Sequence, residues 1–266
     1  MCLILFALAA HPDYPLIVAA NRDEAYSRPT SPAAFWKDHP QVCAGRDLEQ
    51  GGTWLGIARD SRVAAVTNYR QGARASRAER SRGELTRNFL IGDAEPASYM
   101  RAVEARATQY NGFSLIAGHP HALWFYSNRG GAVQRITPGV HGLSNHLLDE
   151  PWPKVRRGIA EMRSLLGAEE SALTVRLFEL LADRAPAPDA YLPATGIARE
   201  RERALSASFI AGEMYGTRAS TLVLVRCDGD VLFRERSFGP GGAATGEIER
   251  RFTLDPAVNR PSAARA

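Results

Sequence analysis

Short apolar runs dominate the beginning of the chain. Residues 3–8 and 16–20 are almost continuously apolar and are separated by a short polar turn. Runs of this length without alternation predict an antiparallel hairpin whose two strands are buried on both faces. A second hairpin is expected from residues 53–58 and 63–68, and the Pro-rich stretch 28–40 before it is expected to be irregular.

Helical spacing appears after residue 80. Ser81 and Glu84 have the spacing of a capping box, and Leu85 and Phe89 follow at helical intervals, so a helix is expected to begin there. A strands-helices-strands order predicts an α+β fold with antiparallel sheets between helices. The other expected elements are helices at 96–108, 153–166 and 172–182 and strands at 113–117, 123–127, 133–136, 142–145, 221–226 and 231–237.

No internal repeat or linker interrupts this order. We therefore expect a single domain over residues 1–253, followed by a disordered tail at 254–266. Within the domain, the stretch 186–203 is rich in Pro, Ala and charged residues and is expected to be a long surface excursion.

Composition argues against several classes of protein. The chain has 266 residues, is 45% apolar and has a net charge of +4. Its positive charge belongs almost entirely to arginines spread along the sequence. A nucleic-acid interface instead clusters basic side chains on one face, so no nucleic-acid partner is expected. No apolar window approaches the roughly 18 residues of a membrane helix, so no transmembrane segment is expected. The three dispersed cysteines predict a reducing, cytoplasmic setting, with no metal and no cofactor.

Cys2 is the sharpest candidate for chemistry. Removal of Met1 would place a thiol and a free α-amine on one residue, and an α-amine with a reference pKa of about 7.7 to 8.0 can accept the thiol proton near neutral pH. The alternative is structural, because a cysteine at the start of an apolar strand is commonly a small buried hydrophobe.

Polar residues mark the end of the second predicted strand. Asn21, Arg22, Asp23 and Glu24 follow an apolar run, and an acid and an arginine beside the strand of Cys2 are suited to orient its amine and thiol. The alternative is a salt-bridge cluster at the end of the hairpin.

Two asparagines and an arginine complete the candidate site. Asn68 and Asn145 each follow a predicted strand and offer side-chain N–H donors suited to an oxyanion hole, although an isolated Asn more often caps a turn. Arg218 precedes a buried strand and is suited to pair with Asp23 or to receive an anionic substrate group. Trp54 lies in a glycine-rich turn and is expected in the core or in a pocket wall.

The order of several motifs resembles the NRDE family, which includes the transport and Golgi organization 2 homologues. The resemblance covers residues 1 to about 253. It rests on Met1-Cys2, the NRDE segment at 21–24, Tyr26-Ser27-Arg28-Pro29, Gly51-Gly52-Thr53-Trp54-Leu55-Gly56, Thr67-Asn68-Tyr69, Arg82-Gly83-Glu84-Leu85, Tyr110-Asn111-Gly112-Phe113, Gly142-Leu143-Ser144-Asn145, Pro151-Trp152 and Tyr215-Gly216-Thr217-Arg218.

The resemblance implies a four-layer αββα sandwich like that of N-terminal-nucleophile (Ntn) hydrolases, similar to bile salt hydrolases and penicillin V acylases. The pattern departs at one position, because the first arginine of those hydrolases would fall near Ala20 and this chain has Arg22. The implied catalytic residues are Cys2, Asp23, Asn68, Asn145 and Arg218, and the expected substrate-binding residues are Asn21, Arg22, Trp54 and Tyr69.

Two functions are compatible with these residues. The first is a cysteine Ntn amidohydrolase or acyl hydrolase that acts on a small acyl-amide or thioester through an acyl-enzyme at Cys2. The second is a non-enzymatic protein that binds and moves haem or an acyl-lipid or acyl-CoA species, as the roles attributed to animal members of the family imply. Only the first requires a free N-terminal amine.

Overall fold

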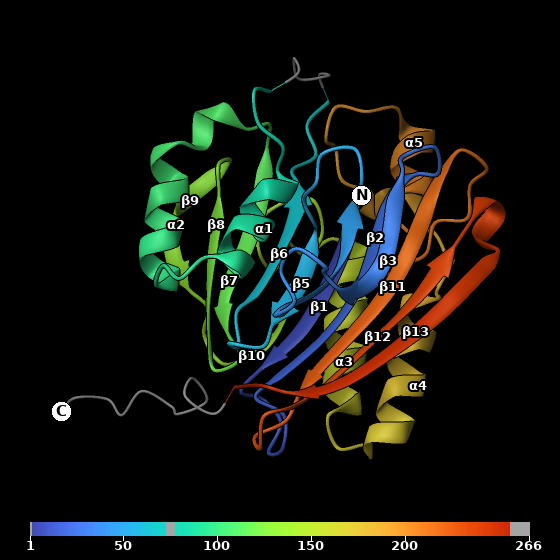
Figure 1. Cartoon of the computed structure of the whole chain (residues 1–266). Helices are drawn as coiled ribbons and strands as arrows, with labels where there is room; N and C mark the ends of the chain where they lie inside the picture. Colours follow the sequence, from blue (N-terminus) through green and yellow to red (C-terminus); the bar gives the residue numbers. More distant parts are fainter. Residues whose placement is uncertain (1, 73–77, 256–266) are drawn as a thin grey trace.

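Two antiparallel sheets lie face to face in the computed structural model, which describes residues 2–72 and 78–255 (Figure 1). The first sheet has the strand order β10-β1-β2-β11-β12-β13 and the second has the order β3-β4-β5-β6-β7-β8-β9. The strands of the first sheet are β1 (Cys2–Leu8), β2 (Leu16–Ala25), β10 (Gly139–Leu143), β11 (Tyr215–Val225), β12 (Asp230–Phe238) and β13 (Ala244–Thr253). Those of the second are β3 (Thr30–Phe35), β4 (Val42–Asp47), β5 (Leu55–Ala58), β6 (Val63–Asn68), β7 (Phe113–His119), β8 (Ala122–Ser127) and β9 (Gly130–Arg135).

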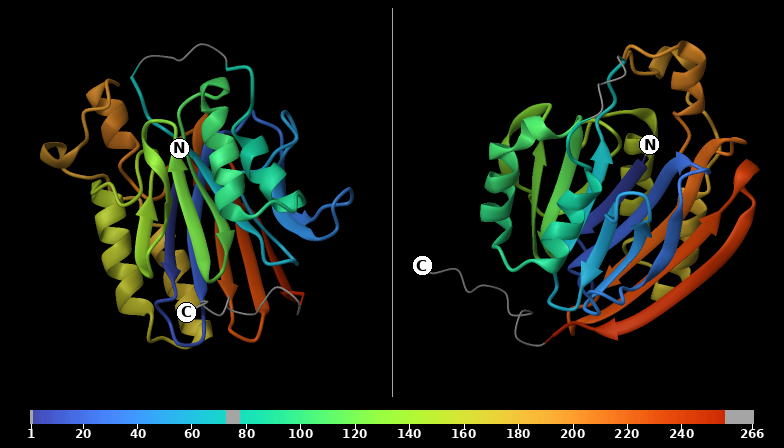
Figure 2. Two further views of the ribbon diagram at one scale, coloured as in Figure 1. Left: turned by 90° about the vertical axis from the view of Figure 1, so that its left-hand side faces the viewer. Right: turned by 45° about the horizontal axis from the view of Figure 1, so that its top comes forward.

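Helices cover the outer faces of both sheets (Figure 2). Helices α3 (Pro153–Leu165) and α4 (Glu170–Leu181) pack on the first sheet, and α1 (Gly83–Ile91) and α2 (Pro96–Ala105) pack on the second. A short fifth helix, α5 (Arg199–Ala204), begins within the predicted surface excursion and ends one residue beyond it. The four-layer αββα arrangement predicted from the family resemblance is confirmed.

The apolar runs that open the chain account for the burial of the first sheet. In β1, Ile4 and Phe6 face the second sheet, whereas Leu3 and Leu5 face the helix layer, and all four are at most 1% exposed. Because successive side chains of a strand alternate between its faces, only a strand with apolar residues at every position can be buried on both sides. This central pairing holds the beginning of the chain in a fixed register.

Some local predictions were wrong. Strand β3 lies inside the stretch 28–40 that we expected to be irregular, and its register shifts between Ser31 and Ala34, next to a proline. Strands β4 and β13 were not predicted either; β13 is a mostly exposed strand with charged residues at many positions. No helix among the described residues is long and apolar enough to cross a membrane.

The predicted capping box at the start of α1 was also wrong. Arg82, not Ser81, occupies the cap position, and its side chain makes no capping bond. The Glu84 carboxylate instead accepts a hydrogen bond from the Tyr110 hydroxyl and pairs with Arg80. At the other end of the chain, Leu254 is buried in the core between the sheets, so the described fold extends to Asp255, and residues 256–266 of the predicted tail lie outside the described residues.

Gly52 provides a test of the packing between the β4–β5 loop and α1. A Cβ at Gly52 would lie 2.5 Å from the backbone carbon of Gly83, which cannot move away as a side chain can. We expect Gly52→Ala to lower the free energy of unfolding by about 1–3 kcal/mol, as overpacking does elsewhere. Urea denaturation measures this, with Gly246→Ala as control because nothing lies within 4 Å of that position. Equal midpoints for the two variants would contradict the packing.

Candidate active site at Cys2

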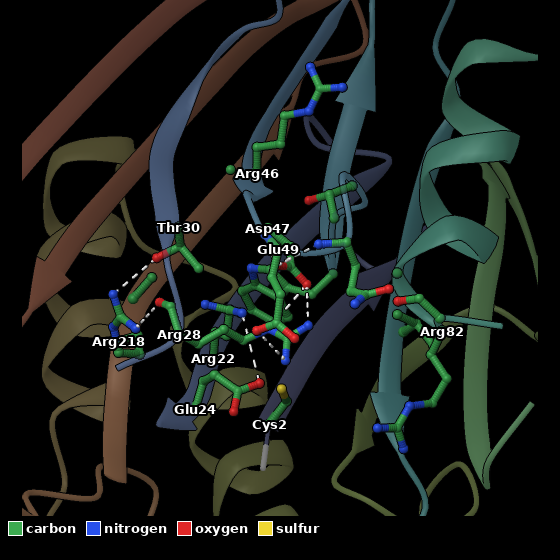
Figure 3. Close-up of a pocket in the computed structure, with 18 of the residues that line it drawn as sticks. Cys2, Arg22, Glu24, Arg28, Thr30, Arg46, Asp47, Glu49, Arg82 and Arg218 are labelled. Carbon is green, nitrogen blue, oxygen red and sulfur yellow. Dashed lines mark hydrogen bonds and ion pairs between the residues drawn. The ribbon is translucent and has the colours of Figure 1, made fainter. Parts of the chain in front are cut away.

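A cavity of about 590 Å³ lies over the beginning of β1 and is lined by residues of both sheets and by the segment before α1. Cys2 lies in its wall, and Figure 3 shows Arg22 and Glu24 beside the Cys2 sulfur. Since β1 and β2 pair antiparallel with Cys2 opposite Arg22, both side chains project from the same face of the first sheet. The thiol is therefore directed toward the cavity by the strand register.

Hydrogen bonds fix the backbone of Cys2. Its nitrogen donates to Asn145 Oδ1 at 3.1 Å, and its carbonyl accepts from Ser144 Oγ at 3.0 Å. The residue is only 8% exposed, and burial raises the pKa of its thiol. A buried thiol with a raised pKa is protonated at neutral pH and requires a base before it can act as a nucleophile.

Asn145 binds the nitrogen of Cys2 and does not line the cavity. It adopts a left-handed backbone conformation with φ of 55°, which Asn tolerates better than most residues. Its Nδ2 donates to the Asn68 carbonyl at 3.0 Å, and its own carbonyl accepts from the Arg70 backbone N–H at 2.7 Å. The geometry thus suits Asn145 for orienting Cys2 better than for the predicted oxyanion contact. Asn68, exposed at the end of β6, does line the cavity.

Asp23 is buried at the end of β2. Its Oδ1 accepts a 2.7 Å hydrogen bond from Thr217 Oγ1, the residue opposite it on β11, and burial raises its pKa. The Asp23 backbone N–H lowers the pKa of the Cys2 thiol. Asp23 is therefore linked to the thiol through its main chain and to β11 through its side chain.

Arg218 lies at a β-bulge in β11, where the register with β2 shifts between Thr217 and Ala219. Its guanidinium donates to three carbonyls in the turn that follows β2 and to Thr30 Oγ1, and it lines the cavity. It does not pair with Asp23, so that predicted alternative was wrong. The bulge aims this side chain at the β2–β3 connection, a common use of bulges near functional sites.

The other cavity arginines differ in their partners. Arg28 and Arg46 form close ion pairs with Asp47 and Asp38, at 2.7 and 2.6 Å. By contrast, Arg22 lies 3.9 Å from Glu24, and Arg82 donates to the Gly112 carbonyl with no carboxylate within 4 Å in the described part of the chain. The N–H groups of these less engaged guanidiniums are suited to bind an anionic group.

Two of the predicted substrate-binding residues lie elsewhere. Asn21 faces the helix layer, where Nδ2 donates to the carbonyls of Leu181 and Ser208, each at 2.8 Å. The Tyr69 hydroxyl lies 2.6 Å from His146 Nε2. Neither lines the cavity, so we correct both assignments. Arg22 and Trp54 do line it.

The sequence analysis missed two buried charged residues near the site. Glu235 lies in the cavity wall, where it accepts hydrogen bonds from the Ala33 N–H at 2.7 Å and from Thr221 Oγ1 at 3.1 Å, and burial raises its pKa. The alternation of β12, which puts Glu235 on the same face as Phe233, was the available signal. Lys154, near the start of α3, is 1% exposed and was not considered. Among the described residues, no three His, Cys, Asp or Glu side chains group as a metal site.

Comparison with known proteins identifies the family. The profile described as Transport and Golgi organisation 2 matches residues 1–240. The chain belongs to this family. The Transport and Golgi organization protein 2 homologue of Bos taurus is 41% identical over 262 residues, covering 89% of this chain and 93% of the relative. The Homo sapiens homologue is 37% identical over 257 residues with the same coverage.

Solved structures similar to this Transport and Golgi organisation 2 family member include hydrolases. One is the C2A mutant of conjugated bile acid hydrolase from Clostridium perfringens, with a TM-score of 0.49, 7% identity, and coverage of 96% of this chain and 92% of that one. Another is penicillin V acylase from Agrobacterium tumefaciens, with a TM-score of 0.43, 10% identity, and coverage of 88% and 82%.

The burial of the cysteines predicts an order of reactivity in this family member. Burial raises the pKa of the Cys43 thiol to about 12, whereas Cys227 is exposed. At pH 8 only about one Cys43 in ten thousand is a thiolate, so we expect iodoacetamide to modify Cys227 in the native protein and Cys43 only after unfolding. Peptide mapping measures both sites. Rapid modification of native Cys43 would contradict the described burial.

Proposed function

We propose that this protein is a cysteine acyl hydrolase of the N-terminal-nucleophile type, which cleaves a small acyl-amide or thioester through an acyl-enzyme at Cys2. The observation that carries the proposal is the geometry of Cys2. Its thiol lies in the wall of a polar cavity, and its nitrogen is held by a side-chain oxygen of Asn145. A nitrogen held next to its own thiol is the arrangement that a nucleophile with an internal base requires.

The reaction begins with a proton transfer within Cys2. After removal of Met1, the nitrogen that donates to Asn145 Oδ1 is an amine, and this amine takes the thiol proton directly or through one water. The sulfur attacks the carbonyl carbon, and when the C–N or C–S bond breaks the leaving group takes the proton. Water then attacks the thioester acyl-enzyme, the carboxylic acid leaves, and the thiol is restored.

Two asparagines take different parts in this proposal. Asn68, which lines the cavity, is the side-chain donor to the oxyanion. Asn145 orients the amine, since its Oδ1 already accepts from the Cys2 nitrogen and its Nδ2 donates to Asn68 O. Preorganised donors of this kind contribute several kcal/mol, about 2.7–4 in a well-studied hydrolase.

The charges of the cavity favour an anionic substrate. Arg22, Arg82 and Arg218 all line it, and none of the three has a carboxylate closer than 3.9 Å among the described residues. A carboxylate or phosphate on the substrate would accept their N–H groups in a charge-assisted contact. The same contacts support the second candidate, a binding protein without chemistry for an anionic ligand such as an acyl-CoA or haem.

Substitution of Cys2 separates the two candidates. For the hydrolase we expect Cys2→Ala to fold normally and to lose turnover by about 10⁴-fold or more, as loss of a nucleophile does. The measurement is product formation across a panel of acyl-amides and acyl thioesters that carry a carboxylate or phosphate. Cys227→Ala is the matched control, because that cysteine is exposed and outside the cavity. Full turnover in Cys2→Ala would refute the proposal, and saturable binding without turnover in the native protein would favour the binding candidate.

A pair of arginine variants tests the anionic substrate. Arg82→Met should raise KM by about tenfold or more, because the free energy of one hydrogen bond to a charged group corresponds to a change of that size in affinity. Arg46→Met is the control, since Arg46 lines the same cavity but is already paired with Asp38. Steady-state kinetics with anionic and neutral versions of one substrate measure the effect. An equal rise for both substrates, or for both variants, would rule out charge recognition by Arg82.

A further inference from the structure

Lys154 has a buried ammonium group beneath the first sheet. It is 1% exposed, and its Nζ donates to the carbonyls of Leu205 and Ala207 at 3.1 and 3.5 Å. No carboxylate lies within 4 Å of it in the described ranges. Burying an ammonium without a close ion pair is costly, so such a position points to a role beyond packing.

A backbone strap, residues 205–210, connects Lys154 with Asp23. Lys154 binds its first residues, and Asn21 donates to the Ser208 carbonyl at 2.8 Å. At its end the Ile210 N–H donates to Thr217 Oγ1 at 2.9 Å, and this hydroxyl donates to Asp23 Oδ1 at 2.7 Å. The ammonium and the carboxylate are thus attached to the same short segment, and Asp23 follows Arg22 and precedes Glu24 in the strand, so its side chain projects from the opposite face of β2.

A buried ion pair lies near this cluster. Arg70 and Glu202 form a buried ion pair at 2.5 Å, and the Arg70 guanidinium lies 4.5 Å from the Trp152 ring. Lys154 and Asp23 are two further buried charged residues of this cluster, and they have opposite signs. Lys154 is therefore one of the cations that can balance Asp23, together with the N-terminal amine.

The direction of the pKa shifts agrees with this arrangement. Burial lowers the pKa of Lys154 to about 8, and the charge of Asp23 opposes the decrease, while Arg70 adds to it. Burial raises the pKa of Asp23, and the charge of the N-terminal amine, the Lys154 charge and the Thr217 hydrogen bond oppose the increase. Each group thus stabilises the charged form of the other.

We propose that Lys154 is a positioning residue that keeps Asp23 ionised from behind the sheet, so that Asp23 can hold the Cys2 amine and thiol in register. The effect of Lys154 on catalysis rests on the proposed function. The coupling between the charges of Lys154 and Asp23 is independent of that function. Lys154 touches no substrate and transfers no proton. Its support of Asp23 is complete only well below pH 8 and is lost as pH rises through about 8, where the ammonium deprotonates.

The lysine content of the chain gives a direct test. Lys37 and Lys154 are its only lysines, so a protein labelled with ¹³C at lysine Cε gives one exposed and one buried signal to titrate by NMR. Asp23→Asn should lower the titration midpoint of Lys154, by about one pH unit or more, because the variant lacks the nearby carboxylate. Asp38→Asn, at an exposed surface pair, is the control and should leave both midpoints unchanged. An unchanged Lys154 midpoint in Asp23→Asn would overturn the inference.

The pH dependence of turnover tests the catalytic consequence. Lys154→Met removes the cation, raises the pKa of Asp23 and should shift the acidic limb of kcat/KM to higher pH by about 1–3 units. Lys154→Arg should restore the position of the acidic limb of the kcat/KM profile in part, and Lys37→Met should give the same pH profile as the native protein. An equal loss at every pH would show a purely structural role and overturn the proposal. If the native protein has no turnover the proposed hydrolase fails, whereas the NMR titration still decides whether Lys154 and Asp23 are coupled.

Discussion

The position of Cys2 depends on the pairing of β1 between β10 and β2. The first residues of a chain are commonly poorly ordered unless an element ties them down. Here the residue lies opposite Arg22 in an interior strand, and Asn145 binds its nitrogen. A slip of one residue would exchange the faces of the strand and direct the thiol into the helix layer. The apolar run that buries β1 on both sides is therefore also what fixes the register of the candidate nucleophile.

Strand β2 separates two charged environments, and this separation organises the site. On the cavity side, Arg22 and Glu24 lie beside Cys2, where solvent and ligand have access. Asp23 also borders the cavity, but its carboxylate points to the other face, toward Thr217 and the strap, where charge is costly unless it is balanced. Because successive side chains of β2 point to opposite faces, neighbouring residues of this strand have different roles. Contact with substrate is possible from one face, and control of the charge behind the nucleophile comes from the other.

The parts of the fold that sequence patterns predicted are those in which local and tertiary preferences agree. Continuous apolar runs gave the central strands, whereas β3 and β13 were missed because edge strands tolerate proline and charge and therefore lack the pattern. At the site, the NRDE segment located Asp23 correctly at the end of a buried strand. It could not show that Asn21 faces the helices, since face assignment requires the register, or that a lone Lys154 is buried, since a lysine in a helix is ordinarily solvated.

The central claim, that Cys2 is a nucleophile with its own amine as base, is tested most directly by the intact mass of the purified protein before and after exposure to a thiol-reactive acyl electrophile. We expect a mass that lacks Met1 and one acyl group that Cys2→Ala does not acquire, apart from any acyl group on the exposed Cys227. A protein that keeps Met1 and shows no adduct dependent on Cys2 would contradict it, because the base and the nucleophile would then both be missing.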